Sequence, residues 1–293
     1  MNILITGSTG FVGSALLRKI NEVKNEDKIF LLSSRHNDNF DTYLYHRDGS
    51  NYVIEAPENV DVLIHLGAWT PKSGGEANDI ERSFSNIQFT KSLLNQLNTL
   101  RKIIFISTLD VYAPTIEAIN EDSSVKPISL YGSSKLFCEE MVKAWANEKS
   151  ISCCILRLGH IYGVGEFQYK KLIPILIGQA LRNEPINIFS DGMEKRSFLD
   201  VDNCADVIWK AAHDESTDLY NVVSGNPVCV AEIARMIKEL SSSKSEINIL
   251  NKVNNTRDCV FDNTKLINQY HVEEKPLEEG LKEEIEYFRS LSV

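Results

Sequence analysis

The sequence has little of what marks a fibrous, disordered or nucleic-acid-binding chain. Its 293 residues include 15 glycines and 8 prolines, far fewer than a collagen-like or low-complexity chain requires. Lysine and arginine number 31 against 41 aspartates and glutamates, a formal net charge of −10. Non-specific nucleic-acid binding depends on a cationic surface, so this balance argues against a nucleic-acid partner. It still permits small anionic ligands, because backbone N–H groups and a few basic side chains can hold a phosphate.

Paired cysteines and long apolar runs are missing as well. The six cysteines include no C-x-x-C pair, so we expect reduced thiols and no metal site. The apolar stretch 172–181 is interrupted by Pro174, Gly178 and Gln179 and is shorter than a membrane span. The chain opens on a strand-like segment instead of a basic and apolar leader. We therefore expect a cytoplasmic protein without a membrane partner.

Short apolar runs alternate with helical patterns over the first two thirds of the chain. The expected strands are 2–5, 28–32, 52–54, 61–65, 102–107 and 152–157, and the expected helices are 11–20, 79–98 and 132–149. This alternation is typical of βαβ units and a parallel sheet. Further on, we expect helices at 169–182, 203–213, 230–240 and 278–290, and short strands at 186–189, 197–200, 219–223, 247–249 and 259–261.

A glycine-rich loop follows the first expected strand directly. The segment Thr6-Gly7-Ser8-Thr9-Gly10-Phe11-Val12-Gly13 has the spacing G-x-x-G-x-x-G and leads into an amphipathic helix. Glycine permits a sharp turn, a close approach of backbone to a pyrophosphate, and close packing of helix on sheet. The helix N-terminus adds N–H groups and a positive dipole. We predict dinucleotide binding by Gly7, Thr9, Gly10, Phe11, Val12 and Gly13, against the alternative of a purely structural turn.

These features together predict an α/β fold. We expect a Rossmann-type doubly wound parallel sheet in residues 1–157, which would bind the dinucleotide. A smaller mixed α/β C-terminal lobe, residues 158–293, would bind the substrate. Segments near 197–213 are expected to return to the first domain.

The end of the second expected strand bears on the choice of dinucleotide. NAD sites usually place a carboxylate there for the ribose hydroxyls, whereas NADP sites use a basic residue for the 2′-phosphate. This chain reads Ser33-Ser34-Arg35-His36, and the first carboxylate is Asp38. Hydroxyl and guanidinium groups suit a phosphate, so we favour NADP(H) over NAD(H), bound through Ser34 and Arg35. An exposed loop arginine is the alternative.

A tyrosine and a lysine four residues apart form the candidate catalytic pair. Tyr131 and Lys135 share one face of the helix expected at 132–149. A phenol has a reference pKa of about 10 and is a poor base at neutral pH. A nearby ammonium group typically lowers such a pKa by about 1–3 units. Tyr131 could then exchange a proton with an alcohol or a carbonyl.

Several further motifs occur in one order along nearly the whole chain. They are Leu63–Ala68, similar to I-H-L-A-A; Asn86; Thr108 four residues before Tyr112; Leu156–Gly163, similar to L-R-x-x-N-V-Y-G; Glu184–Gly192, similar to E-P-I…G-D-G; and Arg196–Asp202, similar to R-D-F-I-x-V-D-D. With the glycine loop and the Tyr-Lys pair, they resemble the extended short-chain dehydrogenase/reductase family. That family comprises NAD(P)-dependent nucleotide-sugar epimerases, dehydratases and reductases.

The resemblance implies a role for each matching residue. Thr108 would hydrogen-bond the reacting sugar oxygen with Ser107 as its neighbour, Tyr131 would be the acid/base, and Lys135 would hold the nicotinamide ribose. The remaining implied contacts are Leu66, Gly67 and Ala68 for the cofactor, and His160, Arg196 and Arg257 for a nucleotide-diphosphate sugar. The resemblance also implies a homodimer formed through the helices near 79–98 and 132–149.

Departures from the family pattern narrow the chemistry. Sugar 4,6-dehydratases carry Asp and Glu after the hydroxyl residue, whereas this chain has Leu109 and Asp110. Leucine cannot donate a proton, which argues against a 4,6-dehydratase. His160 stands where the family has asparagine and either contacts substrate or packs. Among aromatic residues, His65 reads as a packed strand-end histidine, and Trp69 either lines the site or is an ordinary loop aromatic.

The sequence analysis therefore predicts an NADP(H)-dependent reductase of a 4-keto-6-deoxy nucleotide sugar, with Tyr131 as the proton donor. An NAD-dependent nucleotide-sugar 4-epimerase is the competing enzyme. A catalytically silent dinucleotide-binding regulator on the same fold is the third alternative, because a fold alone does not give a function.

Overall fold

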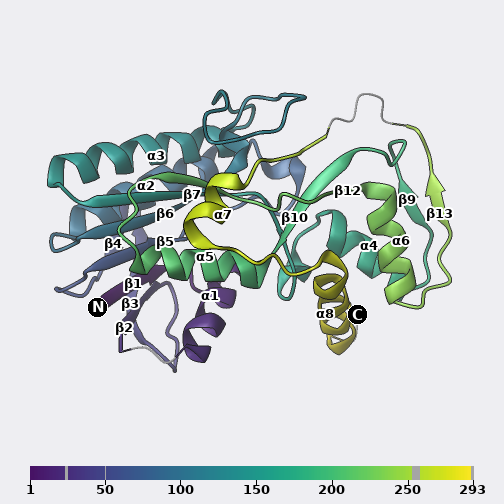
Figure 1. The fold of residues 1–293 in the computed structure, drawn as a ribbon. Coiled ribbons are helices and arrows are strands. Elements are labelled where there is room, and N and C mark those ends of the chain that lie inside the picture. Colours follow the sequence, from purple (N-terminus) through teal and green to yellow (C-terminus); the bar gives the residue numbers. More distant parts are fainter. Residues whose placement is uncertain (24–25, 50, 253–257, 292–293) are drawn as a thin grey trace. The chain divides into compact units, whose positions relative to one another are not determined.

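The computed structural model describes residues 1–23, 26–49, 51–252 and 258–291 (Figure 1). The chain forms two compact units. Unit 1 comprises Met1–Ala113, Ser123–Leu158 and Cys204–Asn221, and unit 2 comprises Pro114–Asp122, Gly159–Asn203 and Val222–Val293. Within the described ranges, no helix has the length and apolar character needed to cross a membrane.

Unit 1 is built on an eight-stranded sheet with the order β11-β7-β6-β5-β1-β2-β3-β4. The strands are β1 (Asn2–Thr6), β2 (Lys28–Ser33), β3 (Asp41–Asp48), β4 (Asn51–Ile54), β5 (Val62–His65), β6 (Lys102–Thr108), β7 (Ser152–Leu158) and β11 (Leu219–Val222). The pairs from β7 through β3 are parallel, and β3 pairs antiparallel with β4. Central strands are continuous apolar runs, such as Ile3, Leu4 and Ile5, because both faces of the sheet are buried.

Four long helices accompany this sheet: α1 (Phe11–Glu22), α2 (Ile80–Gln96), α3 (Leu130–Lys149) and α5 (Val201–His213). Figure 1 shows α2 and α3 side by side along one face of the sheet. Phe89 and Leu93 of α2 and Val142 of α3 join Leu4 and Leu63 in one buried apolar cluster. The Asp79 carboxylate caps α2 by accepting from Arg82 N–H, and the Ser129 hydroxyl caps α3 by accepting from Gly132 N–H.

Unit 2 contains two small sheets, β12-β10-β8 and β13-β9. Its elements are β8 (His160–Tyr162), α4 (Leu172–Leu181), β9 (Ile186–Ile188), β10 (Lys195–Asp200), β12 (Pro227–Cys229), α6 (Val230–Leu240), β13 (Ile247–Ile249), α7 (Thr264–Tyr270) and α8 (Leu277–Ser290). Apolar residues of α4, α6 and α8 pack against β9 to form the core of this unit.

The predicted α/β class with a Rossmann-type parallel sheet is confirmed. Some elements differ from the expectation. The strand β3 was not expected, because Asp41–Asp48 mixes tyrosines with exposed charged residues and its strand character comes from pairing with β2 and β4. The strand expected at 259–261 is wrong: Cys259 and Phe261 form only isolated bridges. The short elements β8, β12 and α7 were likewise not expected.

Candidate active site

The glycine loop joins β1 to α1, and its backbone is packed so closely that no side chain fits at Gly7 or Gly13. Gly7 has φ +74°, and a Cβ there would lie 2.7 Å from the Gly67 nitrogen. A Cβ on Gly13 would lie 2.2 Å from the Gly7 carbonyl oxygen. Both distances are far below contact distance, so glycine is required at each position. A Cβ on Gly10 would lie 3.3 Å from the Gly7 oxygen, a tight contact that a shift of a few tenths of an ångström would relieve, so the packing demand at Gly10 is much weaker than at Gly7 and Gly13.

The start of α1 suits an anionic ligand. Gly10 is the N-cap, no side chain caps the helix, and its first turn holds no acidic residue. No carboxylate of its own first turn therefore compensates the positive end of the helix dipole. Phe11 and Val12 are partly exposed and Thr9 is exposed. Gly7, Thr9, Gly10, Phe11, Val12 and Gly13 thus form a tight turn at a helix N-terminus, and the pyrophosphate of a dinucleotide fits this cradle.

The end of β5 approaches the glycine loop and is fixed by a directed chain of hydrogen bonds. The Gly67 N–H donates to the Thr6 hydroxyl (2.8 Å), whose oxygen lies 2.7 Å from His65 Nδ1. His65 Nε2 lies 3.0 Å from the Thr90 hydroxyl, which donates to the Asn86 carbonyl. Because Thr90 donates onward, His65 donates from Nε2 and accepts at Nδ1.

His65 is therefore neutral and structural, as the sequence analysis expected. Burial lowers its pKa to about 3, with a smaller contribution from the charge of Lys135. Leu66, Gly67 and Ala68 follow it at the carboxyl edge of the sheet and are partly exposed. The expected cofactor contacts therefore stand beside the glycine loop, at the edge where open α/β sheets bind ligands.

Thr108 ends β6 at the same edge, since β6 is the neighbour of β5 and β5 of β1. Its hydroxyl accepts from Asp110 N–H (3.2 Å). The first turn of α3 packs against the backbone that follows Thr108, since a Cβ on Gly132 would lie 2.4 Å from the Asp110 oxygen. Gly132, next to Tyr131, thus lets the start of α3 lie against the end of β6.

Lys135 is almost wholly buried on α3, with 3% of its surface exposed. Its ammonium group donates to the Ile106 carbonyl (2.6 Å) and lies 4.2 Å from the centre of the Phe105 ring. Burial lowers the pKa of Lys135 to about 8, while the charges of Cys138 and Glu139 act to raise it. A lysine in this state is held rigidly and titrates near physiological pH.

Ser107 belongs to a buried ionic cluster. Its hydroxyl donates to Glu139 Oε1 (2.5 Å), and Glu139 also receives two hydrogen bonds from Arg157, at 2.9 and 2.7 Å. The donor of Ser107 is thereby committed to Glu139, which leaves the neighbouring Thr108 as the partly exposed hydroxyl at this strand end.

Tyr131 is buried, and its surroundings include a contact that spacing alone does not reveal. The Trp69 ring lies edge-on to the Tyr131 ring, with 6.0 Å between centres and 88° between planes. The Tyr131 N–H donates to the Ala77 carbonyl (3.0 Å). Trp69 and Ala77 lie more than 50 residues before Tyr131, so no local pattern could predict their contact with it.

Ser34 and Arg35 follow β2 and are exposed. The Arg35 N–H donates to the Ser33 hydroxyl (3.2 Å), which fixes the backbone of this turn. Both residues lie at the carboxyl end of β2, next to the glycine loop strand β1, and the Ser34 side chain hydrogen-bonds the Tyr45 phenol.

The expected substrate residues His160 and Arg196 lie in unit 2. His160 packs against the rings of Phe198 and Phe261, and burial lowers its pKa to about 4, with further contributions from Arg196 and Lys171. Its Nδ1 has no hydrogen-bond partner among the described residues. The Arg196 guanidinium donates to the Lys195 carbonyl. Arg257 lies outside the described residues.

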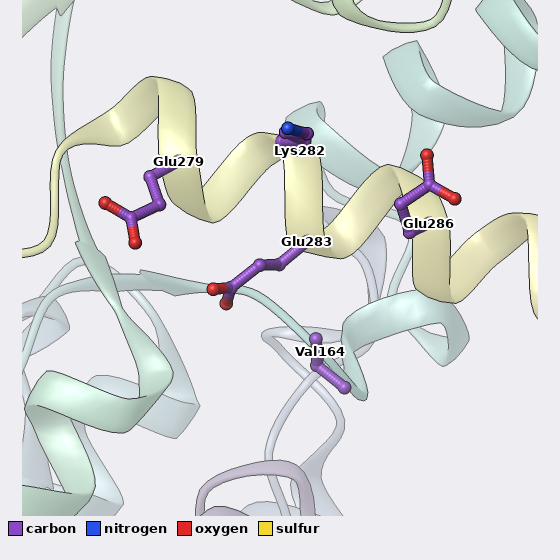
Figure 2. A pocket seen from close by; sticks show the side chains of 5 residues that line it. All are labelled: Val164, Glu279, Lys282, Glu283 and Glu286. Carbon is purple, nitrogen blue, oxygen red and sulfur yellow. The ribbon is translucent and has the colours of Figure 1, made fainter.

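A surface hollow of about 540 Å³ lies along α8 in unit 2 (Figure 2). It is lined by Val164, Glu279, Lys282, Glu283 and Glu286. Three carboxylates and one ammonium line it, and two of the carboxylates are paired with cations, Glu283 with Lys275 and Glu286 with Arg289. None of the expected site residues lines this hollow.

The parallel sheet and the glycine turn between β1 and α1 define a Rossmann-type fold. The chain belongs to the NAD dependent epimerase/dehydratase family, whose model matches residues 3–223. The resemblance to nucleotide-sugar enzymes of the extended short-chain dehydrogenase/reductase type is thereby confirmed, and the family is one of enzymes.

Curated relatives are similar over most of this chain. A trifunctional UDP-glucose 4,6-dehydratase/UDP-4-keto-6-deoxy-D-glucose 3,5-epimerase/UDP-4-keto-L-rhamnose-reductase of Arabidopsis thaliana is 27% identical over 98% of the chain. The match covers 47% of that protein, so the chain spans about half of its length. An uncharacterized UDP-glucose epimerase of Bacillus subtilis is 25% identical, with 99% of both chains covered.

Solved structures share the fold. A UDP-glucuronic acid 4-epimerase from Bacillus cereus, in complex with UDP-glucuronic acid and NAD, has a TM-score of 0.83 and 24% identity, covering 99% of this chain and 100% of that one. A UDP-glucose 4-epimerase from Thermotoga maritima, with UDP-glucose, has a TM-score of 0.82 and 22% identity, with both chains covered fully.

The glycine geometry predicts that folding and dinucleotide binding respond differently to substitution. Gly10→Ala should lower the melting temperature by no more than about 4 °C, because a shift of a few tenths of an ångström accommodates its Cβ. It should weaken NADPH or NAD binding about tenfold or more, because the backbone can no longer approach the phosphates. Gly13→Ala should lower both the melting temperature and the dinucleotide affinity, since overpacking of this kind costs about 1–3 kcal/mol of folding stability. Calorimetric binding and thermal melts measure the two effects.

Gly74→Ala is the matched control, because a Cβ there meets nothing within 4 Å. It should change neither quantity. Wild-type affinity in Gly10→Ala would contradict the assignment of the loop to the phosphates.

Proposed function

We propose that the protein transfers hydride between a nicotinamide dinucleotide and the sugar of a nucleotide diphosphate sugar. The bound dinucleotide would supply or accept the hydride. One observation carries the proposal: the glycine cradle, the buried Lys135 and the Tyr131 end of α3 occur in one compact unit, at or next to the carboxyl ends of neighbouring parallel strands. Family membership and the nucleotide-sugar relatives support the substrate class.

Each residue in this proposal performs a simple task. Tyr131 exchanges the proton of the sugar oxygen, and the Thr108 hydroxyl orients that oxygen. Lys135, held by the Ile106 carbonyl and titrating near neutral pH, contacts the nicotinamide ribose and favours the phenolate of Tyr131. His160, Arg196 and Arg257 are proposed to contact the nucleotide sugar.

The reaction we favour is reduction of a 4-keto-6-deoxy sugar with NADP(H). Ser34 and Arg35 follow β2 without a carboxylate before Asp38, which suits a 2′-phosphate. Leu109, directly after Thr108, offers no proton for the loss of water, so the proposal excludes 4,6-dehydration. The ketone would instead receive its proton from Tyr131.

An NAD-dependent 4-epimerase is the second candidate. It is supported by the relative from Bacillus subtilis named as a UDP-glucose epimerase, which matches over 99% of both chains. An epimerase would oxidise and re-reduce the same carbon and consume no dinucleotide. Net consumption therefore separates the two candidates.

Substitution of Tyr131 tests the proposed chemistry. Wild-type protein should oxidise NADPH with one of a panel of UDP- and dTDP-linked 4-keto-6-deoxy sugars, and Tyr131→Phe should lower kcat by about 10²–10⁴-fold through loss of the proton donor. Dinucleotide affinity should stay within about threefold. Tightly bound NAD with interconversion of 4-epimers and no NADPH consumption would select the epimerase. If the protein turns over no nucleotide sugar and binds a partner equally well with and without Tyr131→Phe, it is the silent regulator, and the enzyme proposal fails.

Substitution of Arg35 tests the cofactor preference. If its guanidinium binds the 2′-phosphate, Arg35→Ala should raise the Kd for NADPH about tenfold or more and leave the Kd for NADH nearly unchanged. The control is Arg47→Ala, an exposed arginine on β3. Equal effects of Arg35→Ala on both dinucleotides would contradict a phosphate contact.

A homodimer through α2 and α3 is also proposed. Ile80 and Phe84 of α2 are 70% and 53% exposed, and Phe137 of α3 is 55% exposed, although these helices pack side by side in unit 1. Large exposed apolar side chains on adjacent helices favour burial against a second copy. These are the two helices through which the family resemblance implies a homodimer.

The pair Phe84→Glu and Phe137→Glu should weaken such a dimer by at least about 30-fold, or about 2 kcal/mol, because each places a charge in the interface. Sedimentation velocity across a concentration series measures the change. Ile116→Glu is the matched control, since Ile116 is 90% exposed and lies in unit 2. Dissociation by Ile116→Glu, or none by the pair, would refute the interface.

A further inference from the structure

Trp69 is fixed by its own backbone immediately after the candidate cofactor strand β5. The Trp69 N–H donates to Asn86 Oδ1 (2.7 Å), and Asn86 Nδ2 donates to the Trp69 carbonyl (3.1 Å). Asn86 is 2% exposed on α2, and both hydrogen bonds are partly buried. A loop residue clamped at both backbone groups by one buried amide has a defined position.

That clamp is anchored in turn to the glycine loop. The Asn86 carbonyl accepts from Thr90, which receives the Nε2 proton of His65, and His65 accepts from Thr6. The donors therefore all point in one direction, from Thr6 through His65 and Thr90 to the Asn86 backbone carbonyl, and reversing any of them would break a buried hydrogen bond. The position of Trp69 is thereby tied to the β1 strand end that carries the cradle.

The indole of Trp69 has two ring partners. The Tyr131 ring lies edge-on at 6.0 Å, and the Arg82 guanidinium lies 5.7 Å from the indole centre. Arg82 is held near Glu76 (3.7 Å) and Asp79 (3.5 Å), on the same loop and at the cap of α2. An edge-on aromatic pair has a preferred geometry, so a fixed indole restricts the rotation of the Tyr131 ring.

The same loop holds the backbone under Tyr131. The Tyr131 N–H donates to Ala77 O, and the preceding Leu130 N–H donates to Asn78 Oδ1, both at 3.0 Å. The first turn of α3 thus has its N–H groups satisfied by residues 77 and 78, and its tyrosine ring contacted by residue 69. Backbone and ring of Tyr131 are fixed by one segment.

We propose that Trp69 is a positioning residue for Tyr131: its indole, carried on a backbone that Asn86 clamps, holds the phenol ring in the orientation used for proton transfer. The effect of Trp69 on catalysis rests on the proposed function. The restraint on the Tyr131 ring does not, because it can be measured without turnover. Trp69 touches neither the hydride nor the transferred proton. It acts by keeping the proton donor in place.

Kinetics of Trp69 variants test the consequence. Trp69→Ala should lower kcat about 10- to 100-fold, because small misplacements of a catalytic group have effects of that size, and leave KM and the dinucleotide Kd within about threefold. Trp69→Phe keeps a ring edge and should stay within about threefold of wild type in kcat. Trp145→Ala, which removes an indole from the far end of α3, is the control and should leave kcat unchanged. Should Trp69→Ala not fold, Trp69→Leu keeps apolar bulk without a ring and should show the same loss.

Fluorine NMR of protein labelled with 3-fluorotyrosine tests the restraint without turnover. The chain has 10 tyrosines, and the resonance missing from Tyr131→Phe identifies position 131. The chemical shift of this resonance should change in Trp69→Ala and Trp69→Leu, because the indole ring current is lost. Its line should also narrow toward that of a freely rotating ring, because the restraint on the ring is lost. In Trp145→Ala it should stay in place.

The results separate the two claims. If no nucleotide sugar is turned over but the Tyr131 resonance responds to Trp69 as stated, the proposed function fails and the restraint stands. If Trp69→Ala leaves the resonance or kcat of active enzyme unchanged, the positioning role is refuted. A rise in KM at constant kcat would refute it too, because Trp69 would then be a substrate contact.

Discussion

Three stretches of backbone meet at the carboxyl end of β1 at distances that only glycine allows. Gly7, Gly13 and Gly67 each lie where a Cβ would come within 3 Å of another atom, and for Gly7 and Gly13 the obstructing atoms are backbone. The helix α1 therefore starts directly against the strand end, and the end of β5 lies directly against the turn. The N-cap of α1 is itself a glycine, Gly10, and makes no side-chain hydrogen bond to the helix.

The close approach of β5 to the glycine loop also allows a series of buried hydrogen bonds next to this junction. The Gly67 N–H reaches Thr6, and the buried histidine, threonine and asparagine that follow carry the hydrogen bonds to Trp69. Each donor in this chain has one acceptor, so the apolar environment costs little. Lys135 obeys a different balance, because burial disfavours its charge, and the Ile106 carbonyl, the Phe105 ring and the Glu139 charge offset part of that cost. A rigid scaffold of satisfied groups thus surrounds one lysine that titrates near neutral pH.

Local sequence patterns predicted the parts of the molecule that depend on local physics. The apolar runs of β1, β5 and β6, the glycine loop and the helical spacing of Tyr131 and Lys135 are each encoded within a few residues. The strand β3 escaped prediction because none of its residues is buried and charged residues stand at both of its ends, so its strand character comes from pairing with β2 and β4. The edge-on contact of Trp69 with Tyr131, and the commitment of Ser107 to Glu139, join segments 62 and 32 positions apart. Such contacts depend on tertiary packing, and the spacing of residues carries no signal of them.

The central claim is that this backbone junction holds a dinucleotide whose reactive end faces Tyr131. A crystal structure of the protein soaked with NADPH or NAD tests it most directly. The account predicts pyrophosphate oxygens within hydrogen-bond distance of the Phe11 and Val12 N–H groups, and nicotinamide ribose hydroxyls beside Lys135. Dinucleotide density away from the α1 N-terminus, or a nicotinamide turned away from Thr108 and Tyr131, would contradict it.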